Sequence, residues 1–247
     1  MVYMKIKAIF SLLALSVVFF LHNALAEAND APHGIIIEDG IEADVKTQLQ
    51  SFYNAGKIIS GVVFAPGGGW AVLFDKGTWA SDNLPDGLAD QLKKCDAANE
   101  KVRIVGFTPL RGWYIVADDH TIYQSKLPQD FSEQIAYVQA KKERIDFLTY
   151  NGLDGWCLGT HNGDYFFGGN PGEYCGRIKG NTRILSVSFE FYNPDQYVAL
   201  LSGKGEYKFD TIANFDAQSM IGWDLEEEGL QIIALSVDLS GNLIEVW

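Results

Sequence analysis

Apolar positions recur along this chain with a step of 43 residues. Trp70, Trp113 and Trp156 follow the step. Further sets keep it too: Ile59, Val102 and Ile145; Phe64, Phe107 and Tyr150; Trp79, Ile122 and Tyr165; Val45, Leu88, Phe131 and Tyr174; Leu49, Leu92, Ile135 and Ile178. A fixed period of this length indicates stacked supersecondary units, which bury their apolar surfaces against their neighbours.

The clearest unit spans residues 102–144, and its hydrophobic period changes part-way along. Three short apolar runs separated by Pro, Gly and Asp predict strands at residues 102–107, 113–117 and 121–125. Short turns between strands favour antiparallel pairing. Apolar residues then recur at helical spacing: Leu127, Phe131, Ile135 and Val138. Pro128 stands where the first helical residue would, so each unit is predicted as three strands followed by a helix.

The same order recurs in units of about 59–101, 102–144, 145–183 and 184–229. In the third unit the predicted helix is shorter, near Gly172 to Ile178, and in the fourth it is near Phe215 to Leu225. The fourth unit also carries an insertion at Phe191 to Gln196, with Tyr197 in the Trp position.

The two ends of the chain complement each other. Residues 230–247 predict only two strands, whereas residues 34–58 predict a lone strand around Ile36 and a helix. Ile36 lies 43 residues before Trp79, which is in a third strand. We therefore expect the N-terminal strand and helix to complete the last unit, an arrangement that hides exposed strand edges.

Residues 34–247 resemble a five-bladed β-propeller. The resemblance rests on the 43-residue step, the shared last unit, and the pairs Gly69-Trp70, Gly112-Trp113 and Gly155-Trp156. It implies a single domain, mainly β with helices, in which five units of three antiparallel strands plus a helix form a closed ring. A helix stands where propellers usually have a fourth, outer strand, and the Trp-Asp signature of the common intracellular propellers is missing. No functional residues follow from the resemblance.

Residues 1–26 have the pattern of a secretory signal peptide. Two lysines precede an apolar run at residues 8–21, and Ala24-Leu25-Ala26 is a cleavage site of the A-x-A type. The run is too short to span a membrane, and an uncleaved anchor is the less favoured alternative. Residues 27–33 read as a polar linker. We expect a secreted or periplasmic protein, monomeric and without a membrane span.

The formal net charge of −13 disfavours two classes of partner. An acidic surface repels phosphate backbones and anionic lipids, so we expect no nucleic-acid partner. The chain also lacks G-x-S-x-G, H-E-x-x-H, a P-loop and G-x-G-x-x-G before a helix. We therefore expect no cofactor and no metal, and name no catalytic residue.

The three cysteines have different predicted environments. Cys95 occupies the apolar slot that Phe52 and Val138 hold at the 43-residue step, so we expect a buried thiol. Cys157 and Cys175 lie in one unit and would close a short loop, so a disulfide between them is possible in an exported protein. Sequence alone does not decide whether it forms.

Candidate ligand-binding residues lie in the turns between second and third strands. These turns would gather on one face of a ring, and loops at one end of a rigid scaffold often carry binding sites. The candidates are Asp75, Asp119, His120, His161, Asn162 and Asp164. Such residues are also ordinary in turns, although the two histidines exceed what a turn needs. Trp70, Trp113 and Trp156 could be sugar-stacking platforms, but their apolar neighbours favour packing between units.

We expect from this sequence an exported, non-enzymatic binding module. Its ligand, a glycan or a protein, would be held on the face formed by the second-to-third strand turns. The alternative is a secreted glycoside-acting hydrolase that uses carboxylates from different units, as the acidic, aromatic-rich composition allows. A third possibility is a structural or inhibitory protein that presents its surface to a partner.

Overall fold

The computed structural model describes residues 35–37, 40–118, 120–169, 183–190, 193–203, 206–211, 234–237 and 243–246. The described part is mainly β, with three helices: α1 (Ala43–Asn54), α2 (Leu88–Ala97) and α3 (Gln129–Ala140). The predicted helices near Gly172 to Ile178 and Phe215 to Leu225 lie outside these residues.

The described strands form five three-stranded antiparallel sheets. Each sheet is given in the order of its hydrogen-bonded strands: β2 (Ile59–Phe64), β3 (Trp70–Phe74) and β4 (Thr78–Ala80); β5 (Val102–Phe107), β6 (Trp113–Ala117) and β7 (Thr121–Ser125); β8 (Ile145–Tyr150), β9 (Trp156–Thr160) and β10 (Tyr165–Gly168); β11 (Arg183–Glu190), β12 (Asn193–Gly203) and β13 (Glu206–Thr211); and β1 (Ile35–Ile37), β15 (Leu243–Val246) and β14 (Ala234–Val237). The predicted unit of three antiparallel strands is therefore confirmed.

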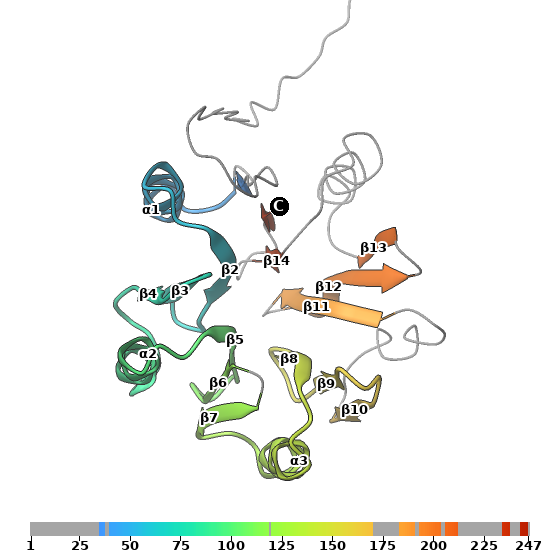
Figure 1. Cartoon of the computed structure of the whole chain (residues 1–247). Coiled ribbons are helices and arrows are strands. Elements are labelled where there is room, and N and C mark those ends of the chain that lie inside the picture. Colours follow the sequence, from blue (N-terminus) through green and yellow to red (C-terminus); the bar gives the residue numbers. More distant parts are fainter. Residues whose placement is uncertain are drawn as a thin grey trace, which may run out of the picture.

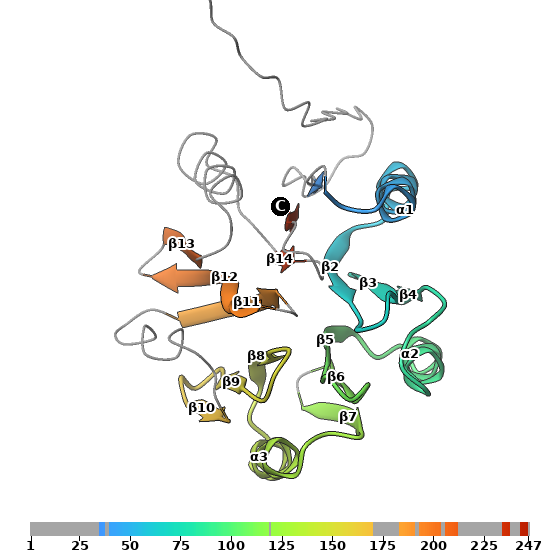
Figure 2. The same ribbon diagram turned by 180° about the vertical axis from the view of Figure 1, so that it is seen from behind.

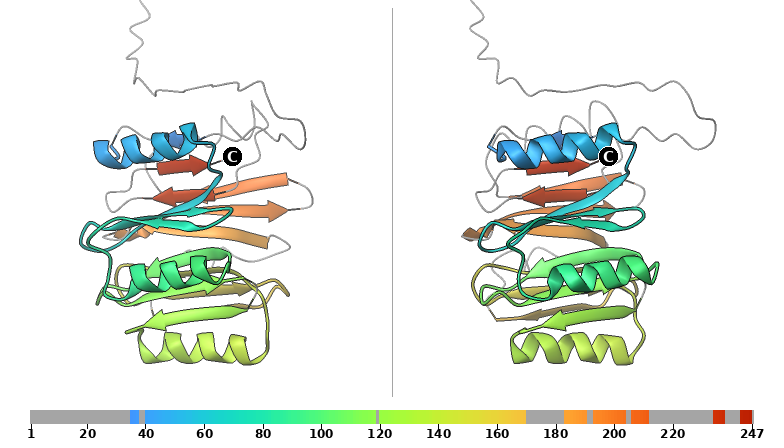
Figure 3. Two further views of the ribbon diagram at one scale, coloured as in Figure 1. Left: turned by 60° about the vertical axis from the view of Figure 1, so that its left-hand side comes forward. Right: turned by 90° about the vertical axis from the view of Figure 1, so that its left-hand side faces the viewer.

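The first strands of the sheets are neighbours. β2 contacts β5, β5 contacts β8, β8 contacts β11, and β14 contacts both β11 and β2. These strands lie toward the middle of the molecule and the three helices lie at its outside, as the views from the front and from behind show (Figure 1, Figure 2). The side views show strands and helices running in about the same direction (Figure 3).

The last sheet contains strands from both ends of the chain. β1 pairs antiparallel with β15, with Ile36 opposite Glu245, and β15 pairs with β14. α1 then packs its residues Val45, Leu49 and Phe52 in one core with Ile244 of β15. The prediction that the N-terminal strand completes the last three-stranded sheet is confirmed.

The middle strand of a sheet serves two hydrophobic cores. In β6, Trp113, Ile115 and Ala117 join the core that contains α2, whereas Tyr114 and Val116 join the core that contains α3. Every residue of β3, β6 and β9 is buried. Alternate side chains of a strand point to opposite faces, so a strand buried on both faces is apolar at nearly every position.

The three tryptophans are packing residues, as predicted. Each is buried, and the indoles of two of them also bond to the preceding unit. Trp113 Nε1 donates to the Asp86 carbonyl (3.0 Å), and Trp156 Nε1 donates to an Asp130 carboxylate oxygen (2.8 Å). They are thus unable to serve as exposed sugar-stacking platforms.

Helix starts differ slightly from the sequence expectation. Pro128 is the N-cap of α3 rather than its first helical residue, because its ψ of 147° is extended. α2 begins at Leu88, after a turn in which the Leu88 N–H donates to the Pro85 carbonyl (3.1 Å). The buried residues of α2, which include Cys95, and Phe131, Ile135 and Val138 of α3 are as predicted, whereas Leu127 lies before α3 and is only partly buried.

The expected insertion in the fourth unit lengthens a hairpin. Tyr197 pairs with Phe189, in the same register as Trp156 with Tyr150, so Tyr197 does occupy the Trp position. Of the predicted insertion, residues 193–196 belong to β12, and Asn193 pairs with Glu190 across an irregular step.

The cysteines are described in part. Cys95 and Cys157 are both buried, which confirms the prediction for Cys95. No disulfide forms among the residues that the structure describes, and Cys175, the predicted partner of Cys157, lies outside them.

Two equivalent residue pairs in neighbouring units keep a similar combined volume, although the residue at each single position differs in size. Gly106 of β5 lies opposite Tyr114 of β6, and a Cβ at Gly106 would come within 2.1 Å of the Tyr114 ring. In the preceding unit the same two positions hold Val63 and Ala71. The larger residue of the pair is on the first strand in one unit and on the second strand in the other. Each residue therefore fits the core only opposite its own partner.

We expect Gly106→Val and Tyr114→Ala to rescue each other. Gly106→Val alone overpacks the sheet at a cost of about 1–3 kcal/mol, and Tyr114→Ala alone leaves a cavity costing about 3–5 kcal/mol. The double variant copies the Val63 and Ala71 pair, so urea unfolding should show it losing at least about 1 kcal/mol less than the sum. Gly106→Val combined with Leu49→Ala, far away in α1, is the control and should be additive. Additivity in both cases would contradict the pairing.

Candidate functional site

The turns that carry the predicted site residues lie beside the starts of the first strands. In each of three units, the first turn residue donates its backbone N–H to the carbonyl of the residue before the first strand. The bonds run from Asp75 to Ile58 (3.0 Å), from Asp118 to Lys101 (2.7 Å) and from His161 to Arg144 (2.8 Å). Because of this repeated bond, the turns lie at the same end of their sheets as the charged residues near the starts of β5 and β8.

Asp75 is held by Lys101, the residue that precedes β5. Its carboxylate forms an ion pair with the Lys101 ammonium, and both side chains are about half exposed (49% and 48%). The hydrogen bond from Lys101 and its positive charge hold the pKa of Asp75 below its ordinary value. Asp75 is therefore a fixed negative charge at neutral pH.

Asp118 and Arg103 continue this contact along the molecule. Asp118 Oδ1 accepts from the Lys101 backbone N–H (2.9 Å), and the Asp118 carbonyl accepts from Arg103 Nε. Arg103 Nη2 donates to the Ile145 carbonyl of the next unit (2.9 Å). Guanidinium donors in a rigid fork suit such a bridge, so Arg103 links two neighbouring units at this end.

A β-bulge sets the side-chain direction at each first strand. The register between first and second strands shifts at Ser60, Arg103 and Asp146, three positions 43 residues apart. The same shift occurs in β11 between Ile184 and Ser186. A bulge leaves its extra residue outside the ladder and re-aims its side chain. The charged residues Arg103 and Asp146 thereby stand in strands that are otherwise uncharged and mostly apolar.

His161 contacts the bulged aspartate of its own unit. Its Nδ1 lies 3.4 Å from Asp146 Oδ1, and Arg144 Nε lies 3.6 Å from the same oxygen. The Asp146 side chain is 5% exposed, whereas that of His161 is 51% exposed. The half-exposed imidazole of His161 thus contacts a buried carboxylate.

Of the four remaining predicted site residues, the structure describes all but Asp119. His120, Asn162 and Asp164 are exposed, and the Asp164 backbone N–H donates to Thr160 Oγ1 (3.3 Å). Asp119 lies outside the described residues. Asp75 and His161 contact Lys101 and Asp146, neither of which the sequence analysis selected.

The missed residues did leave a sequence signal. Arg103 and Asp146 are polar positions within apolar strands, and both follow the first strand residue at the 43-residue step. A polar residue repeated inside a buried strand requires a local explanation, which the bulge supplies. Lys101 has no such signal, because a lysine in a loop is ordinary.

Within the described residues, no group of three or more His, Cys, Asp and Glu side chains could hold a metal ion. None of the described helices is long and apolar enough to cross a membrane. No protein-family model matches the chain, and a search of the curated proteins finds no match.

We expect the stabilisation from Asp75 to depend on pH in one direction. Because its pKa is lowered by folding, the ion pair stabilises the protein above the ordinary pKa of 3.8, and the contribution is lost as the pH falls through the lowered value. At neutral pH Asp75→Asn should lower the free energy of unfolding by about 0.5 kcal/mol, since the pair is half exposed. Urea titrations across pH should show this difference vanish in strong acid and shrink in high salt. Asp82→Asn, an exposed aspartate, is the control; an equal effect there would argue against the pair.

Proposed function

We propose that this chain is an exported, non-enzymatic binding module. Its five sheets would close into a propeller-like ring, and a protein partner would dock on the end formed by the second-to-third strand turns. The observation that carries the proposal is the group of charged side chains of both signs at this end: Asp75, Lys101, Asp118, Arg103, Asp146, Arg144 and His161.

Closure into a ring is supported by the neighbours of the first strands. Contacts run from β2 through β5, β8, β11 and β14 and return to β2, and β1 joins the sheet of β14 and β15. Such closure pairs strands from the two ends of the chain in one sheet and leaves short edges only. Its expected consequence is a rigid arrangement of the turns at each end.

Export is supported by the N-terminal pattern. Residues 1–26 combine lysines, an apolar run and an A-x-A site, which is typical of a signal peptide. We propose a secreted or periplasmic location on this pattern. Edman sequencing of the mature protein should begin at Glu27.

A protein is a better partner for this face than a glycan. The three tryptophans that could have stacked on a sugar are buried in the cores. This end of the molecule exposes the polar residues His120, Asn162 and Asp164. Beside them lie the charged side chains named above, which contact their neighbours. Arranged charges of both signs give specificity and fast association with a complementary protein surface.

The hydrolase alternative gains no support from Asp75. A general acid needs a carboxyl group with a raised pKa near the operating pH, and Lys101 lowers the pKa of Asp75 instead. Asp119, another carboxylate of these turns, lies outside the described residues.

We expect the triple variant His161→Ala, Asn162→Ala, Asp164→Lys to lose its protein partner. Wild-type protein is immobilised and exposed to culture medium and envelope extract of the organism that makes it, and the retained protein is identified and titrated. The variant should bind that protein at least about tenfold more weakly, because a reversed charge opposes a complementary surface.

A matched control separates this face from general charge effects. Asp82→Lys makes the same charge change after the end of β4, whereas Asp75 lies before the start of that strand. It should bind as wild type does. Equal binding by the triple variant, or no protein retained above unfolded bait, would refute the proposal.

A further inference from the structure

Two neighbouring units fill the space between helix and outer strand in different ways. Beside α2, four polar side chains satisfy one another. Gln91 Nε2 lies 3.9 Å from Cys95 Sγ, and the Tyr123 hydroxyl donates to the Glu100 carboxylate (2.9 Å). Burial raises the pKa of Cys95 to about 11, with a smaller contribution from Glu100, so the two pairs lie close together. This cluster leaves neither Gln91 nor Glu100 without a partner.

The next unit keeps half of this cluster. At the 43-residue step, Gln91 and Glu100 become Gln134 and Glu143, whereas Cys95 becomes Val138 and Tyr123 becomes Phe166. Both polar partners are thus replaced by apolar residues. The unit has retained a hydrogen-bond donor and an acceptor but lost the groups that would bond to them.

The consequence is two orphaned polar atoms. Gln134 Nε2 and Glu143 Oε2 are buried and have no hydrogen-bond partner, and they are two of three such side-chain atoms in the part of the chain that the structure describes. The Glu143 side chain is 13% exposed. A buried polar group without a partner is costly, and for an ionised carboxylate more so.

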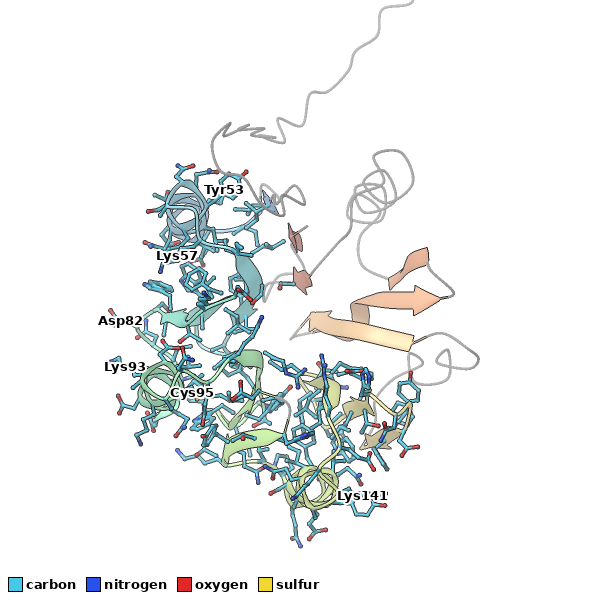
Figure 4. The ribbon with its side chains drawn as sticks, viewed as in Figure 1. Tyr53, Lys57, Asp82, Lys93, Cys95 and Lys141 are labelled. Atoms are coloured by element: carbon cyan, nitrogen blue, oxygen red, sulfur yellow. The ribbon has the colours of Figure 1, made fainter. Side chains whose placement is uncertain are left out.

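An exposed aromatic ring and an ammonium group lie close to Glu143. Tyr137 of α3 is 47% exposed, and its ring meets Phe166 edge to face at 5.9 Å. Lys141, marked on α3 in Figure 4, places Nζ 4.4 Å from the Tyr137 ring and 3.6 Å from Glu143 Oε1. A donor, an acceptor, an ammonium group and an exposed ring therefore occur together.

We infer that Gln134, Glu143 and Tyr137 form a binding site for a hydroxyl-bearing ligand of the sugar class, with one ligand hydroxyl in the place that the Tyr123 hydroxyl takes in the neighbouring unit. A hydroxyl can donate to Glu143 Oε2 and accept from Gln134 Nε2 at once. The C–H face of a sugar ring can lie against Tyr137. Glu143 opposes an anionic ligand and Lys141 a cationic one, which leaves a neutral sugar.

This site shares no residue with the proposed protein-binding face, although Asp164 of that face lies within electrostatic reach of Lys141. It is built on α3, the residues that follow α3, and β10, and none of its side chains is altered by the triple turn variant. Either proposal can fail while the other holds.

The test uses one variant that restores the missing group. Phe166→Tyr supplies the hydroxyl that Glu100 receives from Tyr123, so it should bind to Glu143 and displace the ligand. The probes are methyl glycosides of glucose, galactose, mannose and N-acetylglucosamine, observed by saturation-transfer NMR and titrated by calorimetry. Both Phe166→Tyr and Glu143→Gln should weaken binding about tenfold or more, because a hydrogen bond to a charged acceptor is lost.

Tyr123→Phe is the matched control, since it makes the reverse change in the neighbouring unit and leaves this site intact. It should bind the glycoside as wild type does, and thermal unfolding should show all variants folded, with Phe166→Tyr more stable than wild type. Failure of every glycoside to bind wild type would overturn the inference. So would undiminished binding by Phe166→Tyr, or a crystal structure at saturating glycoside with water alone between Gln134 and Glu143.

Discussion

Burial of the middle strands on both faces is the constraint on which the rest of this structure depends. Alternate residues of β6 belong to different cores, one containing α2 and the other α3, and the side chains of β3 are divided in the same way. A unit with such a strand leaves apolar surface exposed unless a neighbour covers each face. The tryptophans add directed bonds to this packing, because Trp113 and Trp156 donate to residues of the preceding unit. Stability is therefore shared between units, and a change in one core should be felt in the adjacent sheet.

Within that constraint, the repeated units vary by compensation. The bulk opposite Gly106 is supplied by Tyr114, and in the next unit Gly159 of β9 faces Phe147 of β8, whose ring a Cβ at Gly159 would approach to 2.2 Å. Pairs change together because the space between two strands has a set volume. The cluster around Gln134 and Glu143 breaks this rule, since the partners changed and the polar residues did not. An uncompensated change among compensated ones is the physical reason for assigning a ligand there.

At the polar end of the molecule, the sequence predicted the turns but not the contacts that they make. The turns at Asp75, His161 and Asp164 follow from strand and turn patterns, and they do lie at the end where the first strands begin. Their contacts with Lys101 and Asp146 could not be predicted from the sequence. Those two residues come from a different part of the unit and meet the turns only after the strands pair. The bulges left one trace in the sequence, the polar residues Arg103 and Asp146 at the 43-residue step, but the shift in register that they cause exists only once the strands pair.

The sequence by itself determined the repeated unit of three strands, the three described helices and their buried residues, the packing role of the tryptophans, and the completion of the last sheet by the N-terminal strand. These follow from hydrophobic periodicity and the 43-residue step, which are properties of the chain alone. Only the tertiary structure decided which charges are paired, where bulges turn Arg103 and Asp146 out of the ladder, and which buried atoms of Gln134 and Glu143 lack partners. Hydrogen bonds and ion pairs depend on distances between residues far apart in sequence, and those distances are set by packing.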